Sequence, residues 1–490
     1  MIDSPPPPPH RRIVTLALLL GIFLAALDVL VVSPAMPSVV ADLGGLALYP
    51  WVFSAYLLAS TVATPIFGRL ADVHGRRRLY LLGVGMFLLG SALSGASTSM
   101  AQLVAMRALQ GIGAGALLPV TLTLVGDLYP LEERARLQGV FSSVWGIASV
   151  IGPPVGGALV EHAGWRSVFY LNLPFGLAAA ALVARHLREP AREPKPHEFE
   201  LRGAVALSLG LSAVLYALQE LGRGRGLTEP RVGPMALIGV ALLGFFVARE
   251  RRAAEPLVDP HLLRQRLFLA ANAGGFLGFA ALYSATAYVP LLVSGVRGGS
   301  ASAAGVTLMP LSVAWVLASI ASGRLLLRFG YRLTSGLGGL MILLGCLGLA
   351  ATERSASGLH LGGTLAVLGV GMGLTMTSFI VSVQAAAPPG RMGIATSSVQ
   401  FFRSLGAAVG VAVLGALLMS GLRAQGVDPG ALRTAAAEAG LAAAGLPAGP
   451  LMAALRLVFG AGSVFAAGCL AACLAMPGGR AQQHAHQGRR

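Results

Sequence analysis

The chain has 490 residues, of which 55% are hydrophobic and only 11% are charged, whereas a soluble globular domain carries about 25% charged residues. This composition excludes an ordinary soluble protein. The net charge of +16 is no sign of nucleic-acid binding, because the basic residues fall in short loops between apolar stretches. They concentrate on alternate loops, as the positive-inside rule requires of a membrane protein.

Apolar stretches of about 20 residues, long enough to cross a bilayer as helices, recur from Ile13 to Met476. Before them lies a proline-rich tail, residues 1–12, which cannot build helix. The first stretch contains Asp28 and has no clear cleavage site, so we expect a retained helix and not a signal peptide. Six crossings are predicted in an N-terminal half, residues 13–187, at 13–34, 50–69, 79–97, 102–124, 140–160 and 168–187.

A charged linker with several prolines is predicted at 188–202, followed by two additional helices in residues 203–249. A second charged linker, 250–266, leads to a C-terminal six-helix half, residues 267–475, and a polar tail, residues 476–490. The crossings after the first linker are predicted at 203–221, 234–249, 267–293, 303–322, 333–351, 361–385, 394–419 and 452–475. The sequence therefore predicts an all-α integral membrane protein with fourteen transmembrane helices.

The loop charges also predict an orientation and exclude several kinds of chemistry. With both termini in the cytoplasm, most of the 36 basic residues fall on the cytoplasmic side of the cell membrane. No P-loop, Asp-x-Asp or His-Glu-x-x-His sequence occurs, so an ATP-driven pump and a membrane-embedded enzyme are both disfavoured. No metal, cofactor or disulfide is expected, since all three cysteines lie in apolar stretches: Cys346, Cys469 and Cys473.

A short pattern recurs once in each half of the chain. Gly-Arg-Leu at 68–70, followed by Gly75, is repeated as Gly-Arg-Leu at 323–325, followed by Gly330. Each copy follows the second predicted helix of its half. The repeat predicts a duplicated six-helix half, an arrangement in which many secondary transporters place their substrate site at the interface of the halves.

The first copy of this pattern forms a short polar turn between two predicted helices. Gly68 and Gly75 allow a tight reversal and close helix approach. Asp72 can bond the positive end of a neighbouring helix or an arginine, and Arg76 and Arg77 follow directly. We expect this turn to control a conformational change, although its arginines also help to set the topology.

Two ionisable residues stand inside predicted transmembrane helices, Asp28 in the first and Arg107 in the fourth. A charge there costs at least about 2.5–3.5 kcal/mol and is a candidate functional group by default. Both lie about five or six residues from the outer ends of their helices, so at 1.5 Å per residue they can pair. Protonation of Asp28 would break such a pair and couple proton flow to a conformational change. A static salt bridge is the alternative.

The fifth predicted helix carries glycine and proline near its outer end, at Gly152, Pro153, Gly156 and Gly157. Proline frees backbone carbonyls and glycine removes side-chain bulk, which predicts a kinked, closely packed element about which the halves can rock. Ordinary packing of a membrane helix is the alternative.

These motifs resemble those of the major facilitator superfamily. The segment 68–78 is similar to its cytoplasmic loop signature, and 27–37 to the first helix of its 14-spanner drug:proton antiporters. Arg107 and the following glycines resemble the family's fourth-helix motif, which is tied to proton transfer. Residues 152–157 resemble the antiporter motif of its exporters, which is rarer in importers.

The resemblance implies a major-facilitator fold of two six-helix halves with two extra central helices. It also implies a proton-coupled antiporter that exports small lipophilic, in part cationic, compounds, with Asp28 and Arg107 as the coupling pair. A carrier dedicated to one metabolite or natural product is the alternative. The expected partners are this small substrate, protons and the bilayer, with no nucleic acid, and the protein is expected to act as a monomer.

The cargo site is predicted only from soft and amphipathic side chains, because aromatic and thioether groups can re-pack around varied apolar cations. The candidates are Trp51, Tyr56, Gln110, Trp145, Tyr283, Met372, Met376 and Gln384. Simple packing is the alternative for each of them. Glu220 is a further carboxylate, expected at a solvated interface, and a role in coupling for it or for Arg403 is left open.

Overall fold

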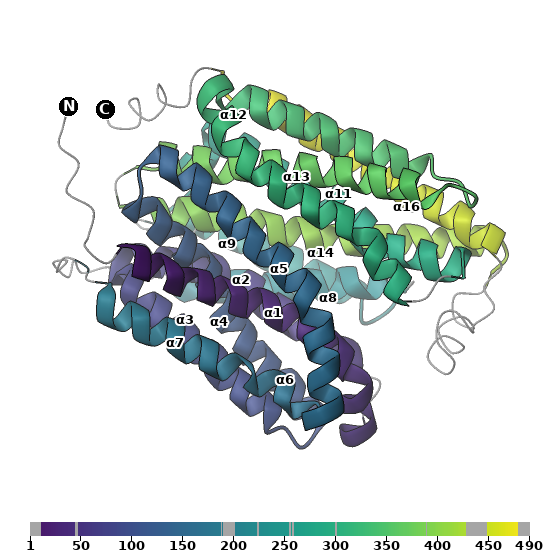
Figure 1. The fold of residues 1–490 in the computed structure, drawn as a ribbon, viewed down its shortest axis with the longest axis horizontal. Helices are drawn as coiled ribbons and strands as arrows, with labels where there is room; N and C mark the ends of the chain where they lie inside the picture. Colours follow the sequence, from purple (N-terminus) through teal and green to yellow (C-terminus); the bar gives the residue numbers. More distant parts are fainter. Residues whose placement is uncertain are drawn as a thin grey trace. The chain divides into compact units, whose positions relative to one another are not determined.

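The computed structural model describes residues 11–44, 48–187, 189, 201–222, 225–253, 256, 259–298, 301–388, 390–427 and 448–478, and every regular element in these ranges is helical (Figure 1). The predicted N-terminal tail up to residue 10, most of the 188–202 linker and the C-terminal tail from residue 479 lie outside the described residues. The chain divides into two compact units. The first unit is Met1–Ala204 with Ala253–Asp259 and Gln384–Phe401, and the second is Val205–Arg252 with Pro260–Val383 and Phe402–Arg490.

In the first unit, α4 packs against α2 and α3, while α1 packs against α5 and α7. Its helices are α1 (Arg11–Leu43), α2 (Tyr49–His74), α3 (Arg76–Gly95), α4 (Met100–Leu128), α5 (Leu131–Ala163), α6 (Arg166–Tyr170), α7 (Asn172–His186) and the first turns of α14 (Met392–Ala424). The first helix continues beyond its predicted end at residue 34, because Met36 and Val39 are apolar and fully buried. The crossing predicted at 168–187 is divided into α6 and α7.

In the second unit, α11 and α12 both pack against α16. Its helices are most of α8 (Leu201–Gly222), α9 (Gly233–Glu250), α10 (Pro260–Arg264), α11 (Arg266–Leu291), the π-helical turn η2 (Leu292–Val296), α12 (Ala301–Ala350), most of α13 (Gly358–Ala386), the rest of α14 and α16 (Ala448–Leu474). The helices α8 and α9 correspond to the two predicted additional crossings.

Two predicted crossings, 303–322 and 333–351, belong to the single helix α12, which is interrupted at Gly330 (φ 82°, ψ 177°). In the first unit, Gly75 separates α2 from α3 with a similar backbone (φ 91°, ψ 147°). Residues with a side chain rarely adopt such a positive φ. The repeated Gly-Arg-Leu pattern with its later glycine therefore marks the same turn in both units.

Glycines also bring equivalent helix pairs together in the two units. A Cβ atom on Gly113 of α4 would lie 2.7 Å from the carbonyl oxygen of Gly83 in α3. A Cβ atom on Gly371 of α13 would likewise lie 2.7 Å from the carbonyl oxygen of Gly338 in α12. Such close contact of two backbones requires glycine at the interface. The duplication is thus visible in backbone packing as well as in a sequence motif.

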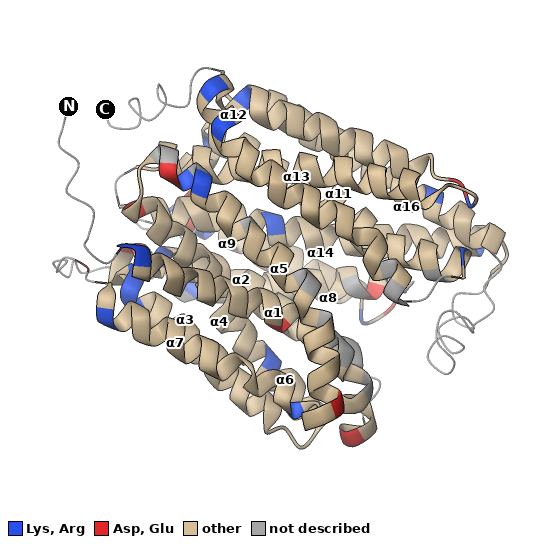
Figure 2. Cartoon of the chain, viewed as in Figure 1, with Lys and Arg blue, Asp and Glu red and all other residues tan. Residues whose placement is uncertain are grey.

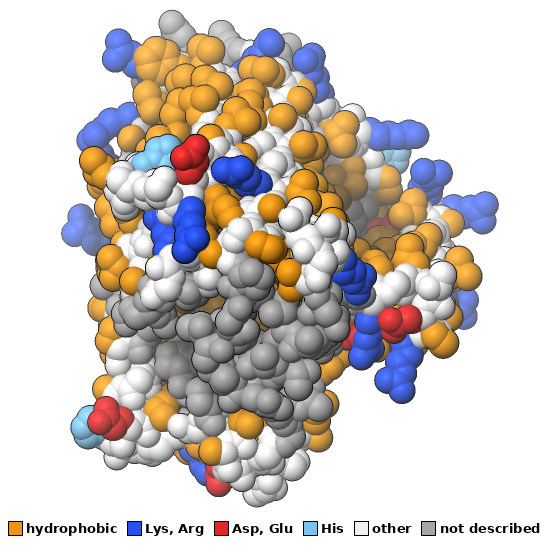
Figure 3. Space-filling view, turned by 90° about the vertical axis from the view of Figure 1, so that its right-hand side faces the viewer, with side chains coloured by type: hydrophobic (Ala, Val, Ile, Leu, Met, Phe, Trp, Pro, Cys, Tyr) orange, Lys and Arg blue, Asp and Glu red, His pale blue; other side chains and the backbone are white. Residues whose placement is uncertain are grey.

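Eleven helices in the described residues are long and apolar enough to cross a membrane. One of them holds the two predicted crossings joined at Gly330, and the remaining predicted crossings lie in α5 and α8, whose side chains are described only in part. Charged residues gather toward the helix ends (Figure 2). Hydrophobic side chains are numerous among the described residues on the face shown in Figure 3. Leu237, Leu317 and Val464 are among the exposed large hydrophobic residues. The chain is therefore a multi-pass membrane protein.

Candidate functional site

The first unit encloses an ion pair between α1 and α4. Arg107 Nη1 lies 2.7 Å from Asp28 Oδ2, and the two side chains are 1% and 0% exposed. Asp28 and Arg107, predicted from their depth to be able to pair, are thus in direct contact. Taking both charges out of water is costly, and only good geometry with further hydrogen bonds can compensate for it.

Among the described residues, the groups hydrogen-bonded to the Asp28 carboxylate are all donors. Gln110 Nε2 of α4 donates to Oδ1 at 2.8 Å, and Asn172 Nδ2 of α7 donates to the same oxygen at 2.9 Å. Arg107 Nη1 donates to Oδ2, and also to Gln110 Oε1 at 2.6 Å. An ionised carboxylate can only accept hydrogen bonds. Three donors around it therefore suit the charged form of Asp28.

The guanidinium of Arg107 is also stabilised by aromatic rings. It lies 4.3 Å from the ring centre of Tyr56 and 5.9 Å from that of Phe169. Arg107 Nε donates to the carbonyl oxygen of Val52 at 3.4 Å. Ring faces attract a desolvated cation by up to about 2 kcal/mol, so the positive charge is satisfied on several sides.

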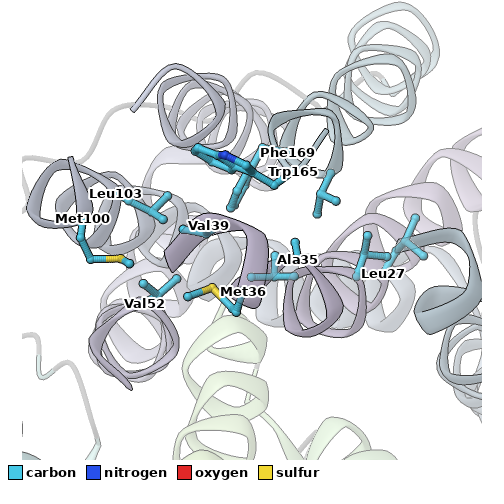
Figure 4. Packing of buried hydrophobic residues seen from close by; sticks show 12 residues of the cluster. Leu27, Ala35, Met36, Val39, Val52, Met100, Leu103, Trp165 and Phe169 are labelled. Atoms are coloured by element: carbon cyan, nitrogen blue, oxygen red, sulfur yellow. The ribbon is translucent and has the colours of Figure 1, made fainter. Parts of the chain in front are cut away.

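A buried apolar cluster adjoins this network (Figure 4). It includes Leu27 and Val31, which flank Asp28 on α1, together with Leu103, Trp165 and Phe169. The cluster excludes water from that part of the first unit. Electrostatic interactions are therefore stronger here than in water, and a polar group left without a hydrogen bond costs more free energy.

The end of α1 is held to the start of α6 by a polar contact outside the predicted membrane crossing. Trp165 Nε1 and Arg166 Nη1 donate to Asp42 Oδ2 at 3.0 Å and 2.8 Å. The hydrogen bond from Trp165, and then that from Arg166, lower the pKa of the Asp42 carboxyl below its usual value. This contact anchors the helix that leads into α7 and its Asn172.

The glycines of α5 allow that helix to approach α1 beside Asp28. A Cβ atom on Gly152 would lie 2.8 Å from Leu30 Cβ, and one on Gly156 would lie 2.8 Å from the backbone oxygen of Val31. A Cβ atom on Gly157 would meet nothing within 4 Å. The side chain of Pro153 lies outside the described residues.

This difference between two adjacent glycines predicts different costs for the same substitution. Gly156→Ala should destabilise the protein by about 1–3 kcal/mol, because the new methyl group overlaps the α1 backbone, which cannot move aside as a side chain can. Gly157→Ala is the matched control and should leave stability almost unchanged. Thermal unfolding of the detergent-solubilised variants measures both, and equal losses would contradict the packing of α5 on α1.

The polar turn around Asp72 ties α2 to the N-terminus of α14. Asp72 Oδ1 accepts from the backbone N–H of Gly393, and Oδ2 accepts from that of Ile394, both at 2.9 Å. Arg76 Nη2 donates to Asp72 Oδ1 at 3.0 Å, while Arg76 Nε lies 2.9 Å from Asp127 Oδ2. Both kinds of partner considered for Asp72, a helix N-terminus and an arginine, are present at once.

The glycines and second arginine of the same turn contact their own neighbours. Gly68 and Gly393 approach so closely that a Cβ on Gly68 would lie 2.9 Å from the oxygen of Gly393. Glu189 accepts from the backbone N–H groups of Arg76 at 2.7 Å and Arg77 at 3.2 Å, which caps α3. Arg77 Nη2 donates to the carbonyl oxygen of Ala184 at 2.5 Å.

The candidate cargo residues lie in both units. In the first unit, Tyr56 and Gln110 belong to the ionic network, and Gln384 donates to the carbonyl oxygen of Leu122 at 2.9 Å. Trp51 is half-buried and Trp145 is exposed. In the second unit, Met372 and Met376 are buried and Tyr283 is half-buried.

The two groups whose roles were left open both lie in the second unit. The Arg403 guanidinium lies 4.4 Å from the ring centre of Phe279. Glu220 was expected at a solvated interface, and this expectation is wrong. Its side chain is buried and forms an ion pair with Arg225 at 2.6 Å, because the backbone N–H of Arg225 also donates to the carbonyl oxygen of Glu220 at 3.1 Å and so holds the arginine beside it.

The sequence reasoning did not assign Asn172 or Ser91 to the site. The signal that marks Asn172 is an amide in an otherwise apolar helix start. Its relation to Asp28 depends on how α7 packs against α1, which spacing within one helix cannot give.

A multi-pass helical protein built from duplicated halves, with a buried ion pair in one of them, has the arrangement of many membrane transporters. Residues 18–411 match the family model described as Major Facilitator Superfamily. The chain belongs to this family, whose members are transporters and not enzymes.

Its relatives include multidrug transporters. Over 410 residues, 83% of this chain, it is 36% identical to the multidrug transporter protein MdtP of Bacillus subtilis (strain 168), of which it covers 75%. Over 405 residues, 82% of this chain, it is 32% identical to multidrug resistance protein 3 of the same organism, of which it covers 79%. The human organic anion transporter MFSD10 (TETRAN) has the same fold, with a TM-score of 0.63 at 18% identity over 94% of this chain and 100% of that one.

Proposed function

We propose that this chain is a proton-coupled antiporter that exports small lipophilic compounds, cationic ones among them, by alternating access. The observation that carries the proposal is the fully buried Asp28 carboxylate, held by three donors inside a membrane helix bundle. The relatives that are 36% and 32% identical to this chain are named as multidrug proteins. These two observations support an efflux pump in which Asp28 binds and releases the coupled proton.

In the proposed cycle, a proton from the outer aqueous phase binds an oxygen of Asp28 and neutralises it. The neutral acid no longer attracts Arg107, and its new O–H would face groups that are themselves donors. The α1–α4 contact therefore weakens and the other conformer is favoured. Loss of the proton to the cytoplasm restores the ion pair, so that inward movement of protons accompanies outward movement of substrate. A potential of 100 mV adds about 2.3 kcal/mol for each charge moved.

We further propose that both termini face the cytoplasm. The orientation follows from the loop charges, because arginine-rich loops are retained on the cytoplasmic side. Export is favoured over uptake by the resemblance of residues 152–157 to the antiporter motif of exporters. Gly152 and Gly156 of this segment lie against α1 beside Asp28. A conformational change that begins at Asp28 would reach α5 directly.

Transport into inverted vesicles tests the proposal. Wild-type protein should accumulate a fluorescent lipophilic cation only when a proton gradient is imposed. Asp28→Asn should lose this dependence on the gradient, because the amide keeps the shape of the side chain but cannot carry a proton. Glu220→Gln, which neutralises a buried carboxylate of the second unit, is compared with it: dependence on the gradient should persist in this variant if Asp28 is the coupling group.

Three results would count against the proposal. If wild-type vesicles accumulate the cation equally with and without a proton gradient, the protein is not a proton antiporter. Full coupling in Asp28→Asn would move the coupling group elsewhere. Transport restricted to one metabolite among many lipophilic compounds would favour the dedicated carrier over the multidrug pump.

A further inference from the structure

Asn172 contacts the Asp28 carboxylate independently of α4. It stands at the start of α7, is fully buried, and donates through Nδ2 to Asp28 Oδ1 at 2.9 Å. The other two donors, Arg107 and Gln110, are both on α4. A movement of α1 relative to α4 would therefore remove two donors together and leave Asn172 in place.

The orientation of the Asn172 amide is fixed by a second buried side chain. Ser91 Oγ of α3 donates to the carbonyl oxygen of Phe169 at 2.8 Å, so its lone pairs are free to accept. Asn172 Nδ2 donates to this oxygen at 2.9 Å. Because a hydroxyl bound in this way accepts from its other neighbour, the NH₂ end of the amide faces both Ser91 and Asp28.

We infer that Asn172 is a positioning residue for Asp28, locked by Ser91, which gives the ionised carboxylate a hydrogen bond that does not depend on α4 and that stays in place when Arg107 and Gln110 later move away. It thereby sets the pH at which Asp28 takes up its proton. This inference rests on the proposed function, in which Asp28 carries the proton. The function itself does not require Asn172, since the ion pair alone could couple proton and substrate.

The charges around Asp28 are few enough for the effect of one amide to be measured. Of the described groups that contact the network, the charged or titratable ones are Arg107 from α4 and the phenol of Tyr56 from α2. The α5 face beside α1 presents Gly152 and Gly156, and α6 presents the ring of Phe169.

The pH dependence of proton uptake tests the inference. Hydrogen bonds to a charged form favour that form, so Asn172→Ala should let Asp28 bind its proton at higher pH. We expect the midpoint of the export–pH curve to move up by about one pH unit, equivalent to about 1.4 kcal/mol. Ser91→Ala should move it in the same direction by a smaller amount, because the amide remains but is no longer locked.

A second readout does not depend on transport. The infrared band of the protonated carboxyl, identified by its absence in Asp28→Asn, should titrate with the same upward shift in detergent-solubilised Asn172→Ala. Ser94→Ala is the matched control for Ser91, since it removes a fully buried hydroxyl from the same helix, one turn further on. It should leave both midpoints unchanged.

The outcomes separate the inference from the proposed function. Unchanged midpoints in Asn172→Ala and Ser91→Ala, with coupling lost in Asp28→Asn, would overturn the inference and leave the function intact. Coupling retained in Asp28→Asn would remove the function itself. If Asn172→Ala does not fold, Ser91→Ala decides, and a shift equal to that of Ser94→Ala would overturn the role of the amide.

Discussion

Replacing Arg107 with alanine should abolish gradient-driven export and lower the stability of the protein by about 3–5 kcal/mol, the usual cost of removing one partner of a buried ion pair. The substitution leaves the Asp28 carboxylate, 0% exposed, without its cation. It also removes the donor to Gln110 Oε1. Thermal unfolding in detergent and vesicle transport measure the two losses separately.

A double variant distinguishes a coupling pair from a static one. Asp28→Asn combined with Arg107→Gln removes both charges while keeping polar groups that can bond each other, so most of the lost stability should return. Gradient-driven export should not return, because no group in the pair can then carry a proton. A double variant that folds and still couples export to the gradient would reduce the pair to a structural contact.

The Asp28–Arg107 contact could be predicted because each residue is conspicuous alone. A charge in an apolar stretch must face the interior, and the rise per residue gives its depth. The role of Gln110 was different, since it was considered only as a cargo contact. An amide one turn from Arg107 can serve either purpose, and its actual partner depends on the side-chain packing around Asp28.

The helices were predictable as apolar stretches, but their ends and breaks depend on tertiary contacts. The first helix extends to Leu43 because Met36 and Val39 are buried against other helices. The break inside α12 sits at Gly330, where only the backbone angle marks the end of one crossing and the start of the next. The exposure of Glu220 was predicted wrongly, because nothing in the sequence indicates that its side chain is buried and paired with Arg225.

The two units share a scaffold and differ in charge. The positive-φ turn and the glycine contacts recur in both, as at Gly75 and Gly330. The position that corresponds to Asp72 in the second copy of the turn is Leu327. Packing that depends on glycine is thus present in both copies of the turn, while the carboxylate is present in the copy where it has an arginine and a helix N-terminus as partners.

Replacing Asp72 with alanine should release the N-terminus of α14 from this turn. The variant loses the acceptor for the backbone N–H groups of Gly393 and Ile394, together with the anion that favours a helix N-terminus. Arg76 also loses a buried partner, so we expect the free energy that holds the N-terminus of α14 in place to fall by about 3 kcal/mol. Hydrogen exchange of a peptide covering 391–400 should become about a hundredfold faster, at about 1.4 kcal/mol for each tenfold change.

Asp127→Ala is the matched control because it removes the other carboxylate bound to Arg76 and leaves Asp72, the acceptor for the α14 backbone, in place. Its side chain is 38% exposed, against 1% for Asp72, so this ion pair is weakened by solvent and should contribute at most about 1 kcal/mol. Exchange at 391–400 should therefore stay within a few-fold of the wild type. If both variants accelerate exchange equally, the charge of Arg76 and not the capping of α14 holds the turn, and the conformational role proposed for Asp72 would pass to the arginine.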